Sequence, residues 1–169
     1  FVNVDAEPVP SLLRGFSAPV LLDANLTDAQ LLTLLAQDSD PFNRWEAGQQ
    51  LALQRLLAAV RSGDAPALDA PYLDAMRRLL RDPTLDAAFK ELTLTLPSET
   101  YIAEQLDEVD PQRVHAVREA MREQLAHALH TDWAWAYEHH KDNGTYRPDP
   151  LSAGRRALTG LALTMLCLE

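Results

Sequence analysis

A glutamate and two histidines are the residues of this chain whose types and spacing best suit metal chemistry. Glu123, His127 and His130 lie four and three residues apart, so a helix would bring all three side chains to one side. Such side chains are common ligands of zinc. The same positions lie opposite an apolar stripe, on the side that a helix normally exposes to water. We therefore expect a solvated helix face and assign no metal ligand.

The alternative is a metal enzyme that uses these three residues, and alanine at His127 tests it through the metal content. H-E-x-x-H, the usual signature of a helical zinc protease, is absent from the sequence. His139 and His140 fall at an expected helix end, where imidazoles suit the negative end of the helix dipole. A helix-end role is therefore favoured for His139 and His140 over a catalytic one.

Other catalytic patterns are missing. The six glycines form neither a phosphate-binding loop nor a dinucleotide-binding pattern. No G-x-S-x-G turn surrounds the serines considered as nucleophiles, Ser11, Ser17, Ser98 and Ser152. The sequence therefore assigns no catalytic residue and no cofactor-binding residue.

A run of carboxylates could bind a cation or the amine of a peptide. It consists of Asp107, Glu108 and Asp110, directly before Pro111. Such a run is more often a solvated helix junction with a capping residue, and we favour that interpretation.

The overall composition limits the class of protein and its partners. With 169 residues, of which 47% are hydrophobic, the chain is long enough for one domain with a core and too hydrophobic for disorder. Its formal charge of −10 repels phosphate backbones and anionic membrane surfaces. No stretch approaches the roughly 18 apolar residues that cross a bilayer. We expect neither nucleic acid nor a membrane as a partner.

The single cysteine and the two ends of the chain carry further expectations. Cys167 cannot form an internal disulfide, and the apolar run "LALTMLCLE" predicts a buried, inert thiol. This fits a reducing compartment, and we expect a cytoplasmic protein. The chain opens on Phe1 without an initiator methionine or a signal peptide, and apolar residues run up to Glu169. We therefore expect a piece of a longer protein.

Helix start signals divide the chain into seven expected helices. An aspartate can cap the first turn while the following proline takes the first helical position. The signals are Thr27, Asp69, Ser98 and the Asp-Pro pairs at Asp40, Asp82, Asp110 and Asp149. Joined by short loops, these helices predict an all-α fold in which antiparallel pairs form the start of an α-superhelix. No residue repeat is regular enough to name a known repeat type.

Apolar spacing defines the two longest expected helices. One covers residues 111–139, about 43 Å at 1.5 Å per residue, and its apolar stripe consists of Val114, Val117, Met121, Leu125, Leu129, Trp133 and Tyr137. The other begins at Pro41 and runs for about five turns, with a broad buried face made of Phe42, Trp45, Leu53, Leu56, Leu57 and Val60. The alternating leucines of "ELTLTLPS" indicate a helix end that continues into an extended turn at Pro97.

The stretch before the helices, "PVPSLLRGFSAPVLL", is expected to be extended. Pro8, Pro10 and Pro19 fix φ near −65° and withhold three N–H donors, which suits a connector or an edge strand. Its core, Ser11–Val20, resembles the junction segment of bacterial aminopeptidase N, a family of zinc-dependent aminopeptidases of the gluzincin type. Three later segments resemble the same family in the same order: "FNRWEAGQQL" (Phe42–Leu51), "LTLPS" (Leu94–Ser98) and "VDPQRVHAVREAM" (Val109–Met121).

The resemblance implies a domain organisation and a function. Residues 1–25 would be a connector or the last strand of a preceding β-sandwich, and residues 26–169 the first part of a helical superhelix. The superhelix would pack on an upstream catalytic domain and help to enclose the cavity in which peptide substrates lose their N-terminal residues. The zinc and its H-E-x-x-H ligands would lie upstream, so no catalytic, cofactor-binding or metal residue is carried over and this chain alone would be inactive. The alternative is an independent helical-repeat scaffold that binds partner peptides or proteins on a concave face.

Overall fold

The computed structural model describes residues 5, 7–20, 22 and 24–168. Over these residues it contains helices and connecting segments but no strand, so the all-α prediction is confirmed. A short 3₁₀ helix is followed by eight α-helices: η1 (Arg14–Phe16), α1 (Asp28–Gln37), α2 (Pro41–Ser62), α3 (Ala70–Arg81), α4 (Ala87–Leu94), α5 (Glu99–Ala103), α6 (Pro111–Ala128), α7 (His130–His140) and α8 (Pro150–Leu166).

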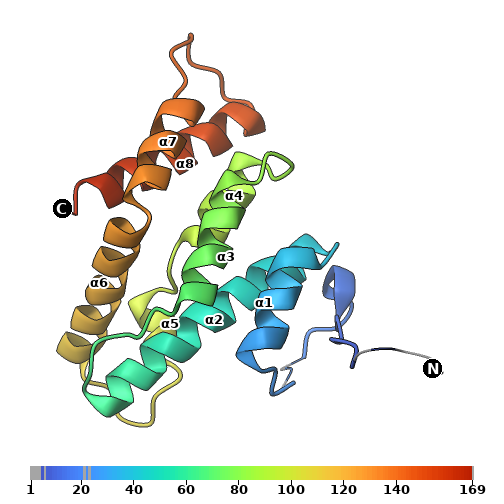
Figure 1. The fold of residues 1–169 in the computed structure, drawn as a ribbon, viewed down its shortest axis with the longest axis vertical. Coiled ribbons are helices and arrows are strands. Elements are labelled where there is room, and N and C mark those ends of the chain that lie inside the picture. The colour runs from blue at the N-terminus through green and yellow to red at the C-terminus, as the bar shows by residue number, and fades with distance from the viewer. Residues whose placement is uncertain (1–4, 6, 21, 23, 169) are drawn as a thin grey trace.

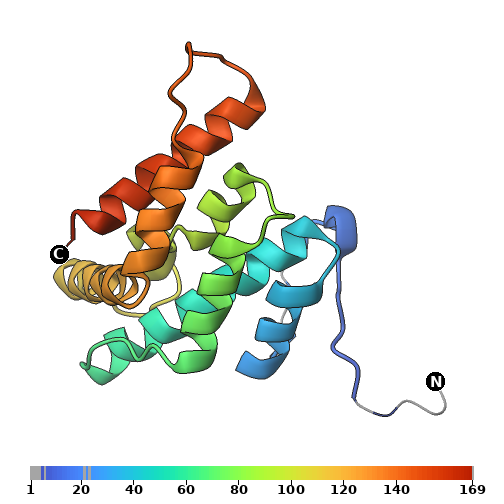
Figure 2. The ribbon, with the colours of Figure 1, turned by 45° about the horizontal axis from the view of Figure 1, so that its top comes forward.

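The helices form packed pairs that follow one another through the molecule. Helix α1 packs on α2 at one end, α7 packs on α8 at the other, and α4 contacts both α2 and α8 between them (Figure 1). The segment before α1 lies on the side of the molecule away from α8, as Figure 2 also shows. This succession of helix pairs is the architecture expected of a helical repeat.

Most of the predicted caps are present. The Thr27 hydroxyl accepts a hydrogen bond from the Gln30 N–H at 3.4 Å, and the Gln30 side chain accepts one from the Thr27 N–H at 2.9 Å, which completes a capping box. Side chains also accept hydrogen bonds from first-turn N–H groups at the other predicted helix starts, namely Asp40, Asp69, Ser98, Asp110 and Asp149.

The prediction of a helix start at Asp82 is wrong. Asp82 instead ends α3, and its carboxylate accepts hydrogen bonds from the backbone and hydroxyl of Thr84 at 2.8 and 2.6 Å. Helix α4 begins later, where the Asp86 carboxylate accepts from the Phe89 N–H at 2.9 Å. An Asp-Pro pair fits the first residues of a turn as well as it fits a cap, and here the turn is formed.

The prediction of one continuous helix over residues 111–139 is also wrong. The backbone leaves helical values at Leu129 (φ −115°, ψ 19°), which separates α6 from α7 and gives eight α-helices in the described chain instead of seven. The indole N–H of Trp133 donates to the Leu125 carbonyl oxygen at 3.2 Å, two turns away. A side chain that takes a main-chain acceptor in this way is a known cause of helix kinks. The apolar stripe still continues through the break, since Leu129 is fully buried.

The buried face of α2 differs from the predicted one. Phe42 is 39% exposed, and of the predicted face only Leu56 belongs to the fully buried core. The innermost residues of α2 are mostly small and include Ala47, Gly48, Ala52 and Ala59. Small side chains let neighbouring helices approach closely, which explains why the large residues of α2 lie at the margin of the core.

Candidate functional site

The structure does not bring the candidate metal ligands together on one helix. Glu123 and His127 are exposed on α6, whereas His130 begins α7 beyond the break at Leu129. Among the described residues, no three His, Cys, Asp or Glu side chains are close enough to hold a metal ion. That this chain carries no metal ligand stays a prediction.

The other candidate residues have structural positions. Asp110 caps α6 through the N–H groups of Gln112 and Arg113, at 3.0 and 3.2 Å. Asp107 and Glu108 are exposed in the segment before it. Ser98 caps α5, and the Ser152 hydroxyl donates to the Asp149 carboxylate at 2.9 Å.

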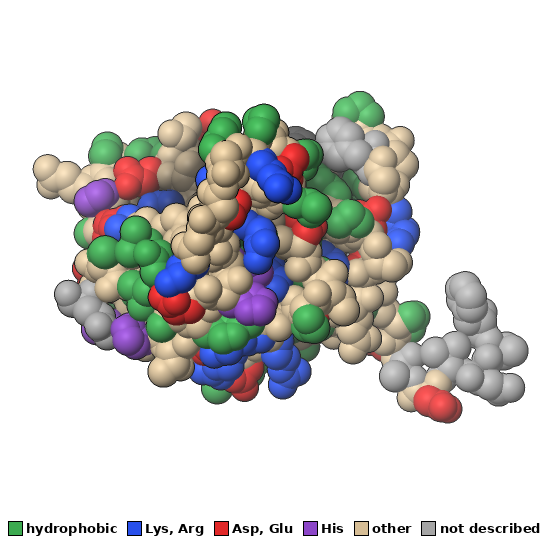
Figure 3. All heavy atoms as spheres, turned by 90° about the horizontal axis from the view of Figure 1, so that it is seen from above, with side chains coloured by type: hydrophobic (Ala, Val, Ile, Leu, Met, Phe, Trp, Pro, Cys, Tyr) green, Lys and Arg blue, Asp and Glu red, His purple; other side chains and the backbone are tan. Residues whose placement is uncertain are grey.

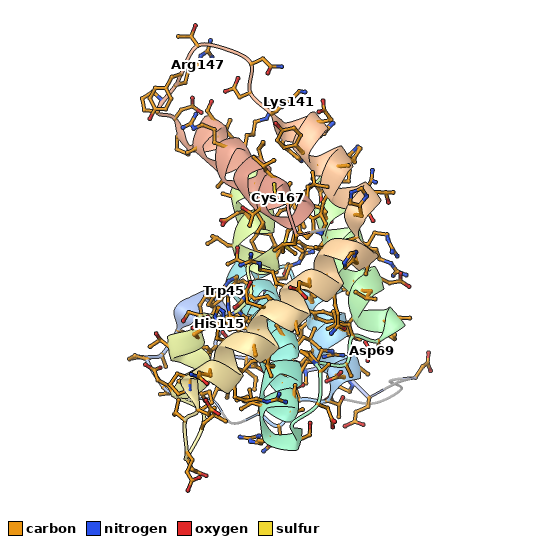
Figure 4. The ribbon with its side chains drawn as sticks, turned by 90° about the vertical axis from the view of Figure 1, so that its left-hand side faces the viewer. Trp45, Asp69, His115, Lys141, Arg147 and Cys167 are labelled. Carbon is orange, nitrogen blue, oxygen red and sulfur yellow. The ribbon has the colours of Figure 1, made fainter. Side chains whose placement is uncertain are left out.

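The predicted burial of Cys167 is wrong. The cysteine is exposed directly after the end of α8 (Figure 4). The apolar residues around it in the sequence include both faces of the helix, and Cys167 falls on the outer one.

The feature that most resembles a functional site is a polar joint between the first described segment and the α1–α2 turn. We call it the Arg14 joint, formed by Ser11, Leu12, Arg14 and Gly15 on one side and Asp38, Ser39, Asp40 and Asn43 on the other. The Arg14 guanidinium donates to the Asp38 carboxylate at 2.6 Å, to the Ser39 hydroxyl at 2.7 Å and to the Ser11 hydroxyl at 2.8 Å.

Two further contacts fix the backbone of the joint. The Gly15 N–H donates to the Asp40 carboxylate at 2.8 Å, and the Asn43 amide donates to the Leu12 carbonyl oxygen at 2.9 Å. Gly15 has φ +64° and Leu13 φ +52°, so the chain turns through left-handed backbone that is unfavourable at Leu13. Hydrogen bonds of the Gly15 N–H to the Asp40 side chain and of the Asn43 side chain to the Leu12 carbonyl oxygen offset the cost of this left-handed backbone.

The charges of the joint are stabilised in their ionised forms. Burial acts to raise the pKa of Asp38, but hydrogen bonds from Ser11, the Asp40 N–H and Arg14, with the charge of Arg14, outweigh it and lower that pKa. Hydrogen bonds from the N–H groups of Asn43 and Gly15 lower the pKa of Asp40. Both carboxylates are therefore charged at neutral pH, and their contribution to stability is lost only as the pH falls below about 3.8.

Replacing Arg14 by lysine is expected to loosen the joint without unfolding the helices. Lysine keeps the charge but lacks the planar fork that reaches Asp38, Ser39 and Ser11 together. Amide hydrogen exchange at Gly15 should become faster by about tenfold, since a charge-assisted network of this kind contributes about 1.5 kcal/mol. Exchange in α7 serves as the internal reference. Unchanged exchange at Gly15 would contradict the proposed role of the fork.

A groove with both polar and apolar side chains runs beside the joint. It has a volume of about 630 Å³ and lies between the described residues of the segment before α1, the outer face of α2 and α5. Five of the most exposed large hydrophobic side chains line it: Leu12, Val20, Leu22, Phe42 and Tyr101. On the face shown in Figure 3, acidic and basic side chains lie among the hydrophobic ones.

A second groove of about 430 Å³ lies between α1 and α3. Its floor is apolar, with Leu35 and Leu79, and Arg44 and Arg78 lie along its walls. The Arg44 guanidinium donates to the Leu35 carbonyl oxygen at 2.9 Å and lies 5.7 Å from the centre of the Phe89 ring, so it is held by the fold.

Of the residues of the Arg14 joint, the sequence predicted a structural role only for Asp40, as a helix cap. Arg14 and Asn43 both lie in segments that resemble aminopeptidase N, and only that resemblance marked them. The Asn43 amide donates to the Ser11 hydroxyl at 3.0 Å, although the two residues are 32 positions apart. No spacing rule connects an extended segment to a helix start at that distance.

The fold and the joint define a helical-repeat region entered through a fixed connecting segment. Residues 28–169 match the family described as "Domain of unknown function (DUF3458_C) ARM repeats", and the chain belongs to this family. The match covers α1 to α8 and begins after the segment that carries Arg14.

Comparisons with known proteins extend the similarity to the connector. Aminopeptidase N of Caulobacter vibrioides is 38% identical over 156 residues, which are 92% of this chain and 18% of that protein. Aminopeptidase N of Escherichia coli is 35% identical over 169 residues, 98% of this chain and 19% of that protein. The crystal structure of Legionella pneumophila aminopeptidase A in complex with aspartic acid superposes with a TM-score of 0.85 at 29% identity, over 99% of this chain and 20% of that one.

These findings confirm the resemblance to bacterial aminopeptidase N. The chain spans about a fifth of the length of the relatives it matches. No helix in the described part of the chain is long and apolar enough to span a bilayer.

Proposed function

We propose that this chain is a non-catalytic helical region of a zinc-dependent aminopeptidase N, where it packs on the catalytic domain and helps to enclose the active-site cavity. The observation that carries the proposal is the similarity to aminopeptidase N over 92–98% of the chain, with about a fifth of the relatives' length matched. The whole enzyme would act in the cytoplasm and remove N-terminal residues from peptides.

Residues 1–25 would join this region to a preceding β-sandwich, and residues 26–169 would form the first part of the superhelix. The Arg14 joint supports this division, because it fixes the segment before α1 to the α1–α2 turn and so sets the direction from which the chain arrives. Within this segment, Arg14–Phe16 form the 3₁₀ helix η1, so the described part of the connector is not extended throughout.

The zinc of such an enzyme would be held outside this chain. The described residues offer no group of three metal ligands, and the sequence has no H-E-x-x-H. When bound, zinc polarises the scissile carbonyl and activates water. The residues of this chain would supply the wall of the cavity and control of access to it, with the groove beside the joint available for contact with a neighbouring domain.

The isolated chain is expected to show no aminopeptidase activity. The test compares purified 1–169, loaded with zinc and given an aminoacyl reporter, with the same chain after addition of the upstream catalytic region. Only the mixture should release the reporter, at a rate at least 100 times that of the chain alone. A full-length bacterial aminopeptidase N is the positive control.

Zinc-dependent turnover by 1–169 alone would overturn the proposal. The variant His127→Ala separates this outcome from contamination, since a helix-borne metal enzyme would lose both its bound zinc and its turnover. If the chain instead bound peptides tightly without any catalytic region, the independent scaffold would be the better assignment.

A further inference from the structure

Three helices meet around a buried lysine. Helix α8 crosses α4 at Gly154, where an added Cβ atom would lie 2.9 Å from the Ala88 backbone nitrogen. Lys90, two residues further along α4, is only 2% exposed. A cation buried in this way makes its surroundings sensitive to any further positive charge.

A histidine at the end of α7 faces the same region. The Nε2 atom of His140 is buried and has no hydrogen-bond partner in the described chain. The ring stands edge-on to those of Trp135 and His139, with centroid distances of 5.9 and 5.0 Å. In its neutral form the imidazole fits this apolar setting, whereas a proton on Nε2 would be a buried donor with no acceptor.

We propose that His140 makes the packing of the α7–α8 pair on α4 sensitive to acid: protonation of its ring places a third positive charge beside Lys90 and Arg155, and the pair opens from α4. The inference concerns this chain's own conformation and does not depend on the proposed function.

Charged groups from each packed element support this assignment. Burial, followed by the charges of Lys90 on α4, His139 on α7 and Arg155 on α8, lowers the pKa of His140 to about 4. Burial lowers the pKa of Lys90, and the charges of Asp82 and Asp86 act against that effect. The carboxylates of Asp82 and Asp86 accept hydrogen bonds from the N–H groups of Thr84 and Phe89.

The sign of the pH dependence follows from these values. In the opened form His140 regains its ordinary pKa of 6.5. Between pH 6.5 and 4 its ring is therefore protonated in the opened form and neutral in the closed form. The closed packing is therefore at full strength above pH 6.5 and weakens as the pH falls towards 4. From pH 7 to pH 5 the equilibrium constant for opening should rise by about twentyfold.

Amide hydrogen exchange of the whole chain at pH 7 and pH 5, corrected for the intrinsic rate of each amide, measures this constant. Amides of α7 and α8 should show the increase, while those of α1 serve as the internal reference. His140→Gln cannot titrate and should lose the pH dependence, whereas the matched control His139→Gln should keep it. Lys90→Met should reduce it, because one of the opposing charges is gone.

Equal opening at the two pH values in the wild-type chain would overturn the inference. So would an increase of the same size in α1, which would indicate general acid unfolding, or a pH dependence that disappears in His139→Gln but not in His140→Gln. Retained protection of the α1 amides in each variant at pH 7 shows that it has folded.

Discussion

Replacement of Trp133 by alanine is expected to lower the free energy of unfolding by about 4 kcal/mol. Trp133 is 1% exposed and is the largest fully buried side chain of the described structure. It lies on α7 where this helix packs against α8 and α3, so the cavity would be lined by side chains from several helices that cannot all move inwards. Urea unfolding followed by circular dichroism measures the change, with the midpoint and the slope reported separately.

Trp133→Phe is the matched control for this prediction. Phenylalanine keeps most of the aromatic volume but cannot donate to the Leu125 carbonyl oxygen at the α6–α7 break. Its loss should be about 1.5 kcal/mol, from one hydrogen bond and a small void. A loss below about 1.5 kcal/mol for Trp133→Ala would contradict the central place that the structure gives this residue.

The helices that were predicted well are those whose signals are local. A cap and the N–H groups that it holds lie within three residues of each other, so Thr27 and Asp110 could be assigned from sequence alone. The apolar stripe from Val114 to Trp133 is also local, since it follows from helical spacing.

The errors arise where two structures are both acceptable to the local sequence signals. The Asp82-Pro83 pair is compatible with both a cap and a turn, and α4 is capped by Asp86. The break at Leu129 preserves the apolar stripe, so periodicity could not reveal it, and no proline or glycine marks it. In both cases a side-chain hydrogen bond accompanies the structure that forms, from Thr84 to Asp82 and from Trp133 to Leu125, and neither bond follows from a spacing rule.

Ion pairs between helices that are far apart in the chain could not be predicted from the sequence. Asp132 of α7 is 6% exposed and accepts hydrogen bonds from Arg77 and Arg81 of α3 at 3.1 and 2.7 Å. The Arg81 guanidinium also lies 4.3 Å from the centre of the Trp135 ring. These residues are more than 50 positions apart, and charge patterning along a single helix gives no sign of the pairing. The Arg14 joint was missed for the same reason.

A pair of glycine substitutions on α8 separates helix propensity from helix packing. Gly160 faces open space, so Gly160→Ala should stabilise the chain by about 0.5–1 kcal/mol through the higher helix propensity of alanine. Gly154→Ala brings the same propensity but places its Cβ 2.9 Å from the Ala88 nitrogen and 3.0 Å from the Ala88 Cβ. Because the nearest obstacle is backbone, α8 and α4 must move apart, and a net loss of about 2 kcal/mol is expected.

The two glycine variants also bear on the acid sensitivity assigned to His140. If α8 moves away from α4 in Gly154→Ala, the region around Lys90 opens to water and His140 loses much of its desolvation, so its pKa should rise towards 6.5. Nuclear magnetic resonance titration of the His140 ring protons measures this pKa in both variants. Gly160→Ala should leave it near the wild-type value. Equal stabilities, or equal His140 titrations, in the two variants would show that the contact between Gly154 and Ala88 does not hold α8 against α4.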